Sequence, residues 1–235
     1  MGKDNYHAFD TKEMYTALGI KGLEEFVIKT GFRKSNSLLT KLKEEFLGKK
    51  LDIDTKEFLK IFDLYKTKEN NYLKIFEVGC GYGRIGNVLM NQKNIYYQGI
   101  ELNEIFVNKF RSFWYDTYYK NQIIKGDFLE MPYRTNFDYI LFPWSVIGDF
   151  SENEGQLKVL KKSNKILKLE GKVLIDIPLD LMNNVSLYTP APFNVHEIYD
   201  IENLGFKYSN SYYYTTLTNR HREIIELQKL REIQL

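Results

Sequence analysis

The sequence predicts an α/β protein with a doubly wound, mostly parallel sheet and an α-helical segment ahead of it. The first observation is a short apolar strand, residues 73–78, that runs directly into four glycines, Gly79, Gly81, Gly83 and Gly86. A strand followed by a glycine-rich turn and a helix is typical of the ligand-binding edge of such a sheet. The second observation is that strand and helix patterns alternate after residue 70. The third is that residues 1–70 show helical spacing without strand alternation.

The composition fits one substantial domain with a small appendage, since the chain has 235 residues, 43% of them hydrophobic and 27% charged. The formal net charge of +2 gives no large field for nucleic acid or membrane. No apolar run approaches the roughly 20 residues that span a bilayer, and the start of the chain lacks a signal-peptide core. The single cysteine, Cys80, has no second cysteine for a disulfide or a metal site. We therefore expect a cytoplasmic protein without a membrane segment.

The chain divides into an amino-terminal part, residues 1–70, and a sheet-forming part, residues 71–235. In the first part, apolar residues such as Leu38, Leu42 and Phe46 recur at spacings of three and four, which predicts an α-helical cap or lid. Strands are expected over 73–78, 95–100, 122–128, 137–142 and 172–177, because each is a short apolar run.

Helices are expected between these strands. One covers 84–91, one covers 104–119 with aromatic residues at core spacing, and one covers 152–169 and ends at Gly171. The last of them carries Lys158, Lys161, Lys162 and Lys165 on one side, which we interpret as a solvated face. An irregular stretch over 179–195, a short helix over 196–204 and two long strands over 206–217 and 222–230 complete the chain.

The carboxylate of Glu77, within the glycine-rich run, distinguishes it from a phosphate-binding turn, because a carboxylate would repel a pyrophosphate. A cationic ligand suits this turn better. The stretch Glu77-Val-Gly79-Cys-Gly81-Tyr-Gly83 resembles the first motif, E/D-x-G-x-G-x-G, of the class I methyltransferases that use S-adenosylmethionine. A dinucleotide-binding fold is the alternative, since a glycine motif alone is a weak signal.

The resemblance implies a Rossmann-like, seven-stranded sheet closed by a terminal antiparallel hairpin, with S-adenosylmethionine as cofactor. Glu101 ends the second strand at about the 20-residue separation at which an acid meets a ribose in this architecture. In the family, an acid at the position of Asp127 accepts a hydrogen bond from the adenine amino group. The resemblance also implies that the backbone N–H of the neighbouring Phe128 reaches a ring nitrogen and that the Phe128 ring packs on the base. The cofactor-binding residues expected are Glu77, Gly79, Cys80, Gly81, Gly83, Glu101, Leu102, Asp127, Phe128, Pro143 and Trp144.

The loop after the fourth strand, residues 143–150, is expected to overlie the transferred methyl group. Trp144 and Ile147 can flank the cofactor, while Ser145 or Asp149 can touch the acceptor; Asp149 can alternatively cap the following helix. A hydroxyl acceptor needs a base, whereas an amine need only arrive neutral. The candidate bases are Asp149 and His196, and also Tyr6 or His7 if the amino terminus folds over the site. Tyr6, Ser145 and Ile147 are the candidate acceptor-binding residues.

The function expected is methyl transfer to an O or N atom of a small-molecule or small peptide-like acceptor. Nucleic-acid or protein methylation is one alternative. Methyltransferases that act on adenine or glutamine resemble one another in an acidic or amide residue, two prolines and an aromatic residue after the fourth strand, whereas this chain has Leu141-Phe142-Pro143-Trp144. A non-catalytic partner protein with the same fold is a further alternative. We expect a monomer or homodimer, no nucleic-acid partner and no metal site.

Overall fold

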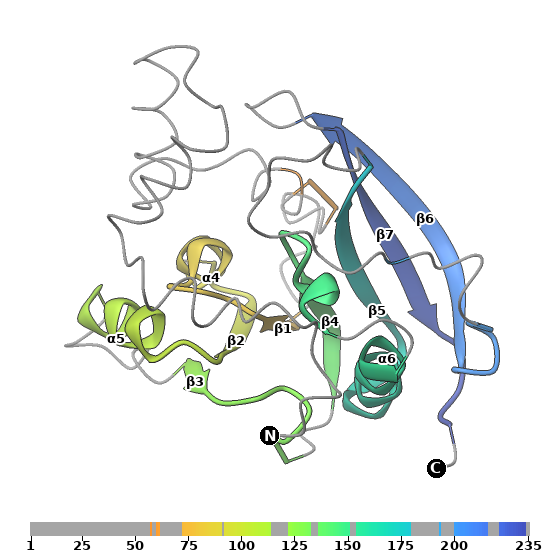
Figure 1. Cartoon of the computed structure of the whole chain (residues 1–235), viewed down its shortest axis with the longest axis horizontal. Coiled ribbons are helices and arrows are strands. Elements are labelled where there is room, and N and C mark those ends of the chain that lie inside the picture. Colours follow the sequence, from red (N-terminus) through yellow and green to blue (C-terminus); the bar gives the residue numbers. More distant parts are fainter. Residues whose placement is uncertain are drawn as a thin grey trace.

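The computed structural model describes residues 57, 60–61, 72–90, 92–113, 122–132, 136–150, 154–179, 193, 200–215 and 221–233. Within this part of the chain, seven strands form one sheet in the order β3-β2-β1-β4-β5-β7-β6 (Figure 1). The first five strands run parallel, and β7 lies antiparallel between β5 and β6. The predicted doubly wound sheet with a terminal antiparallel hairpin is therefore confirmed. Of the predicted amino-terminal cap, only Glu57, Lys60 and Ile61 are described, and they are helical.

The elements follow the order expected from the sequence. They are β1 (Leu73–Val78), α4 (Arg84–Leu89), β2 (Ile95–Glu101), α5 (Glu104–Phe113), β3 (Ile123–Lys125), β4 (Phe137–Phe142), the 3-10 helix η3 (Val146–Asp149), α6 (Glu154–Ile166), β5 (Leu167–Pro178), β6 (Phe206–Thr215) and β7 (His221–Lys229).

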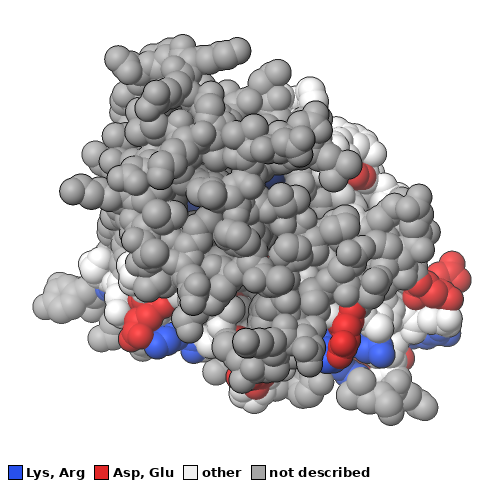
Figure 2. Space-filling model, in the orientation of Figure 1, with Lys and Arg blue, Asp and Glu red and all other residues white. Residues whose placement is uncertain are grey.

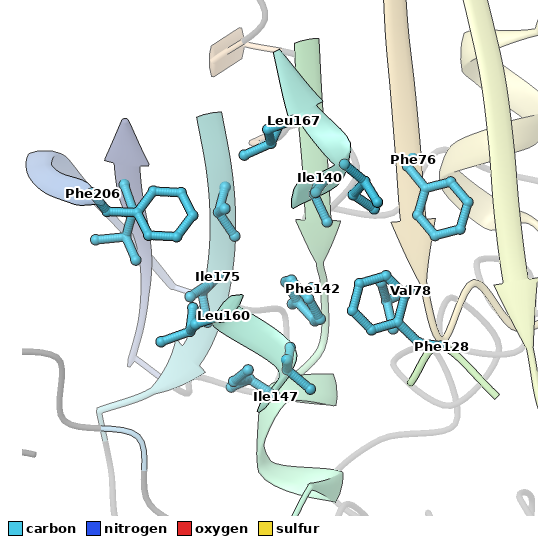
Figure 3. Packing of buried hydrophobic residues seen from close by; sticks show 14 of the residues in the cluster. Phe76, Val78, Phe128, Ile140, Phe142, Ile147, Leu160, Leu167, Ile175 and Phe206 are labelled. Atoms are coloured by element: carbon cyan, nitrogen blue, oxygen red, sulfur yellow. The ribbon is translucent and has the colours of Figure 1, made fainter. Parts of the chain in front are cut away.

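Each central strand contributes side chains to two hydrophobic clusters, one on each face of the sheet, because successive residues of a strand point to opposite faces. Ile75 packs with residues of α4 and α5, whereas its neighbour Phe76 packs on the other side with residues of α6. Figure 3 shows the second cluster, in which Phe76, Phe142 and Phe128 lie together. Full burial of one such side chain stabilises the fold by about 1.5–3 kcal/mol.

The strand order reverses at β1, which pairs with β2 on one side and with β4 on the other. The connections after β1 and β4 consequently leave the sheet on opposite faces and separate at its carboxyl edge. In open α/β sheets this is the position of the ligand crevice. The glycine-rich turn follows β1 and the loop beginning at Pro143 follows β4, so both lie at this position.

Three details of the predicted elements are wrong. The short helix expected over 196–204 is a turn over its described residues 201–204. The helix α6 ends at Ile166 and the strand begins at Leu167, so Gly171 lies inside β5 instead of ending the helix. The pairing of β5 with β4 shifts register there, and Glu170 has a φ of 65°. A Cβ at Gly171 would lie 2.9 Å from the backbone oxygen of Lys168, which explains the need for glycine. Lys162, predicted to be solvated, is 6% exposed.

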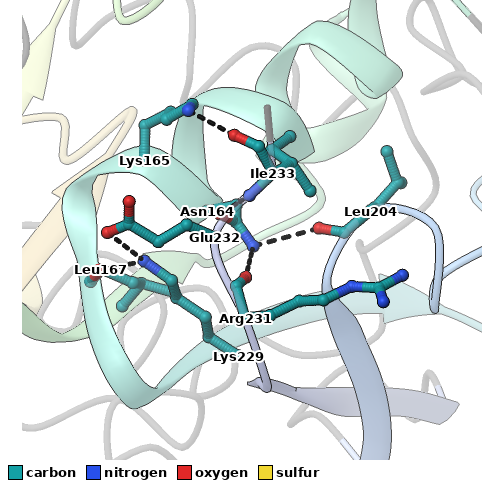
Figure 4. Close-up of polar contacts among 8 residues, drawn as sticks. All are labelled: Asn164, Lys165, Leu167, Leu204, Lys229, Arg231, Glu232 and Ile233. Atoms are coloured by element: carbon teal, nitrogen blue, oxygen red, sulfur yellow. Dashed lines mark hydrogen bonds and ion pairs between the residues drawn. The ribbon is translucent and has the colours of Figure 1, made fainter. Parts of the chain in front are cut away.

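The carboxyl-terminal segment is tied to α6 by a buried amide (Figure 4). Asn164 is fully buried, and its Nδ2 donates to the backbone oxygens of Leu204 at 3.1 Å and Arg231 at 2.9 Å. Its Oδ1 accepts from the backbone N–H of Ile233 at 3.3 Å. One side chain thus satisfies three backbone groups from two segments that are distant in sequence.

Charged side chains of opposite sign lie next to one another along the lower edge of the described surface in Figure 2. Exposed pairs there and elsewhere include Lys125 with Glu104 and Lys158 with Glu154, each at 2.6 Å. Such exposed pairs each contribute little to stability, about 0–1 kcal/mol. No helix within the described ranges is long and apolar enough to cross a bilayer.

We predict that Asn164→Ala lowers the free energy of unfolding by about 2–3 kcal/mol, because it leaves buried backbone groups without partners. Urea unfolding followed by circular dichroism measures this change. Asn203→Ala is the matched control, since Asn203 is exposed and bonds to Asp200 nearby. Equal losses in the two variants would contradict the role assigned to Asn164.

Candidate functional site

The glycine-rich turn carries its backbone back across the ends of β1 and β2. Gly79 and Cys80 donate their N–H groups to the backbone oxygen of Ile100, at 2.9 and 3.2 Å. Gly79, Gly81 and Gly83 have φ values of 64°, 55° and 80°, a region that favours glycine. A Cβ added at Gly79 would lie 2.8 Å from the Val146 side chain, whereas one added at Gly81 would meet no atom within 4 Å. Among the described residues, Gly81 therefore borders open space.

Glu101, at the end of β2, is hydrogen-bonded to this turn. Its Oε2 accepts the N–H of Gly81 at 2.8 Å, and its Oε1 accepts the N–H of Asn103 at 2.8 Å. Desolvation raises the pKa of the Glu101 carboxyl above its usual value, although the hydrogen bonds from Asn103 and Gly81 oppose the shift. A carboxylate offers about four lone-pair positions, so two accepted N–H groups leave capacity for ligand hydroxyls.

Glu77 lies beneath the turn in a buried polar cluster. It is 2% exposed, and its Oε2 accepts the hydroxyl of Tyr97 at 2.5 Å. Burial, and next the charge of Glu77, raise the pKa values of both Tyr97 and Cys80 well above their usual range. The Cys80 thiol is therefore neutral at physiological pH, and its side chain is 4% exposed. Glu77 and Cys80 thus support the turn from below.

Tyr97 was not anticipated from the sequence, although two glycines were a signal for it. A Cβ at Gly86 would collide with the Tyr97 ring, and a Cβ at Gly99 would lie 2.6 Å from the Cys80 sulfur and 2.8 Å from the Tyr97 hydroxyl oxygen. A glycine in the middle of a strand indicates that another group approaches closely. Gly99 has that position in β2, opposite Glu77 of β1.

Asp127 follows β3 and is 6% exposed, and its Oδ1 accepts the N–H of Leu129 at 2.8 Å. The buried Lys162 of α6 fixes the same loop, because its Nζ donates to the backbone oxygen of Leu129 at 2.9 Å and to that of Met131. Burial lowers the pKa of Lys162, and the charge of Asp127 opposes that shift.

The expectation that the Phe128 ring packs on a base is corrected by its position. The ring is 2% exposed and lies between Phe76 and Phe142, with centroid distances of 6.0 and 5.9 Å. Phe128 is a large apolar side chain beside the hydrophobic cluster between the sheet and α6, so burial in the core is favoured over exposure at the edge. Leu102, the other neighbour of a strand-end acid, is half-buried.

The loop after β4 has one exposed aromatic ring between two buried residues. Pro143 is buried, Trp144 is 48% exposed and Ser145 is 7% exposed. Ile147 is 1% exposed and belongs to the core, so its expected contact with acceptor or cofactor is also corrected. The amphipathic turn of η3 places Ile147 inward, while Asp149, at the end of η3, is half-buried.

A polar network from β5, β6 and β7 holds this loop, and sequence analysis missed it. Asp176, which is fully buried, accepts the N–H of Trp144 at 2.8 Å and the Nε of Arg222 at 2.8 Å. The hydroxyl of Tyr214 donates to the same carboxylate at 3.1 Å. Asp176 stands in the otherwise apolar run 173–177 of β5, and a charge in such a run indicates a buried partner. The partner itself is 46 residues away and has no local signal.

The remaining candidates are not placed. Tyr6, His7 and His196 lie outside the described residues. In the described part of the chain, no three His, Cys, Asp or Glu side chains are arranged to hold a metal ion. The structure therefore brings together the turn with Glu77, Glu101 and Asp127 at one side of the edge, and Trp144, Ser145 and Asp149 at the other.

Neither a protein-family model nor a curated protein matches the sequence. Solved structures do match the fold. Magnesium protoporphyrin IX methyltransferase from Synechocystis PCC 6803, with bound S-adenosylhomocysteine, is 13% identical, with 94% of this chain and 100% of that chain covered and a TM-score of 0.59. Phosphoethanolamine N-methyltransferase 2 from Haemonchus contortus is 14% identical, with 88% of this chain and 60% of that chain covered and a TM-score of 0.60.

The cyclase SpnF is similar as well, at 12% identity and a TM-score of 0.55, with 76% of this chain and 82% of that chain covered. A fold that methyltransferases share with a cyclase does not by itself decide the reaction. The strand order, the glycine-rich turn after β1 and these likenesses agree on the architecture. The chain has the fold of the class I S-adenosylmethionine-dependent methyltransferases.

Proposed function

We propose that the protein binds S-adenosylmethionine and transfers its methyl group to an O or N atom of a small-molecule or small peptide-like acceptor. The observation that carries this proposal is the contact between Gly81 and Glu101 at the sheet edge. It places a carboxylate with spare acceptor capacity beside a backbone that borders open space, which suits a ligand with neighbouring hydroxyls.

The residues at this edge have the chemical groups that this cofactor requires. Glu101 would accept the two ribose hydroxyls, and Asp127 would accept the adenine amino group beside the backbone of Phe128. The backbone of Gly79 to Gly83 would hold the methionine portion, with the buried Glu77 beneath it contributing negative potential toward a cation. S-adenosylmethionine supplies an already activated methyl group, so the chain itself must bind, align and exclude water.

The acceptor would lie over the loop after β4, beside Trp144 and Ser145. The two methyltransferases with similar folds are named for a porphyrin and a phosphoethanolamine, which supports a small acceptor. The absence of the adenine- and glutamine-modifying motif after β4 supports the same choice over nucleic acid. Residues 1–70 would form a lid over residues 71–235, with His196 or Tyr6 available near the acceptor.

We predict that Gly81→Ala weakens S-adenosylmethionine binding by about tenfold or more, since its Cβ would occupy the open space at the turn. Isothermal titration calorimetry measures the affinity. The fold should lose only about 1 kcal/mol, the cost of a side chain at positive φ. If the parent protein gives no binding heat with S-adenosylmethionine, the proposed cofactor is wrong.

Cofactor affinity should fall as the pH is lowered through the raised pKa of Glu101. The ionised carboxylate accepts ribose hydroxyls, whereas the protonated form, present below that pKa, has lost acceptor capacity. Because the pKa is raised, the loss begins at a higher pH than for an ordinary glutamate. Calorimetry across the acidic range should show this dependence in the parent protein and a weaker, flatter affinity in Glu101→Gln. Glu104→Gln, at an exposed carboxylate, is the matched control and should behave as the parent.

A screen for conversion of S-adenosylmethionine to S-adenosylhomocysteine across hydroxyl, amine and carboxylate compounds tests the transfer itself. If Asp149 is the base for a hydroxyl acceptor, Asp149→Asn should lower kcat by about 100-fold or more and change cofactor affinity little. Asp200→Asn, at an exposed turn, is the control. Equal losses in kcat and cofactor affinity would reject this role for Asp149.

A further inference from the structure

Two consecutive residues after β4 have an unusual backbone. Trp144 and Ser145 have φ values of 56° and 66°, although neither is glycine. A non-glycine residue in this region costs about 1–3 kcal/mol and persists only where its surroundings hold it there. Such strain is concentrated at functional sites, and neighbouring contacts must hold these two residues in their strained conformation.

Asp176, at the carboxyl end of β5, holds both backbone amides. Its Oδ2 accepts the N–H of Trp144 at 2.8 Å, and its backbone oxygen accepts the N–H of Ser145 at 3.0 Å. The carboxylate is fully buried, so these bonds are protected from water. One residue thereby fixes the orientation of two successive peptide groups.

Arg222, at the start of β7, completes the contact from the terminal hairpin. Its Nε donates to Oδ1 of Asp176 at 2.8 Å, and its Nη2 donates to the Ser145 hydroxyl oxygen at 2.7 Å. Only the planar fork of a guanidinium offers two donors with this fixed separation. Tyr214 of β6 adds a third donor to the Asp176 carboxylate at 3.1 Å.

The contact with Arg222 also fixes the position of the Ser145 hydroxyl oxygen. A guanidinium cannot accept a hydrogen bond, so the Ser145 oxygen accepts from Arg222 and its own hydrogen is not used in this contact. Among the hydrogen bonds of the described residues, none uses that hydrogen. Ser145 therefore keeps a donor beside the carboxyl edge of the sheet.

On its other side the loop contacts the glycine-rich turn. The Arg84 guanidinium, directly after Gly83, lies 3.7 Å from the centroid of the Trp144 ring. Val146 packs against Gly79, where a Cβ would come within 2.8 Å. The loop is thus held between the turn that follows β1 and the hairpin that ends the chain.

We propose that Asp176 and Arg222 are positioning residues, which hold the Trp144 ring beside the bound cofactor and aim the Ser145 hydroxyl at the acceptor. This inference rests on the proposed function. It assigns part of the reaction geometry to the terminal hairpin, separate from Glu101 and the turn that bind the cofactor.

The test uses Trp144 as its own reporter. The chain has two tryptophans, so Trp114→Phe leaves Trp144 as the single tryptophan in the full-length protein, and it is excited selectively over the tyrosines. In this background Arg222→Met and Arg222→Lys are compared with Arg231→Met. The guanidinium of Arg231 donates to the backbone oxygen of Glu202 on an exposed surface. The measurements are acrylamide quenching of Trp144 and, with S-adenosylhomocysteine as the probe, calorimetric affinity and the change in emission on binding.

In Arg222→Met, the affinity for S-adenosylhomocysteine should stay within about threefold of the Arg231→Met control. The quenching constant of Trp144 should rise by about twofold, because the loop is no longer held, and the emission change on binding should be lost. Arg222→Lys should lie between, since a single ammonium keeps the charge but lacks the two separated nitrogens that reach Asp176 and Ser145. This variant carries the comparison if Arg222→Met does not fold.

Unchanged quenching and emission in both Arg222 variants would overturn the proposal. A loss of affinity in step with the loss of the emission change would also overturn it, because the pair would then support the whole site. If the parent does not bind S-adenosylhomocysteine, the proposed function fails. The quenching comparison then still decides whether Arg222 positions Trp144.

Discussion

A buried carboxylate needs hydrogen-bond donors, and this requirement organises the carboxyl edge of the sheet. Glu101, Asp127 and Asp176 follow or end β2, β3 and β5, and each accepts a backbone N–H from a loop beside it. The glycine-rich turn, the loop after β3 and the loop after β4 are each fixed in this way. These acids therefore shape the three loops at this edge, and Glu101 and Asp127 are also the ones that we propose bind the cofactor.

At Glu101 the proposed binding role opposes the stability of the fold. A carboxyl whose pKa is raised by burial is costly in its ionised form, and that cost disappears when the group is protonated at low pH. In the proposed function ligand binding needs the ionised form, so the fold would carry an unfavourable charge at neutral pH. The hydrogen bonds from Gly81 and Asn103 reduce this cost without removing it.

The sequence predicted the sheet and its terminal hairpin well, because these depend on local signals. Apolar runs, the glycine-rich turn and acids at strand ends are all readable within a few residues. Gly171 was misread because its reason is close approach of the Lys168 and Phe137 backbones, and Lys162 because helical spacing does not show what covers each position. Phe128 and Ile147 were assigned to the site because the direction of their side chains is set by packing. The pair of Asp176 and Arg222 depends on strand pairing between β5 and β7, which no spacing along the chain reveals.

The cluster beneath the glycine-rich turn has a consequence for how this protein can change in evolution. The volume of the Tyr97 side chain is accommodated jointly by Gly86 and Gly99 on either side of it. A larger residue at either glycine is blocked while Tyr97 remains, and a smaller residue at 97 leaves a cavity and removes the donor to Glu77. Single substitutions at these positions are destabilising, whereas paired substitutions that keep the total side-chain volume are tolerated better. The accessible mutational paths through this region are therefore few, and they pass through compensated pairs.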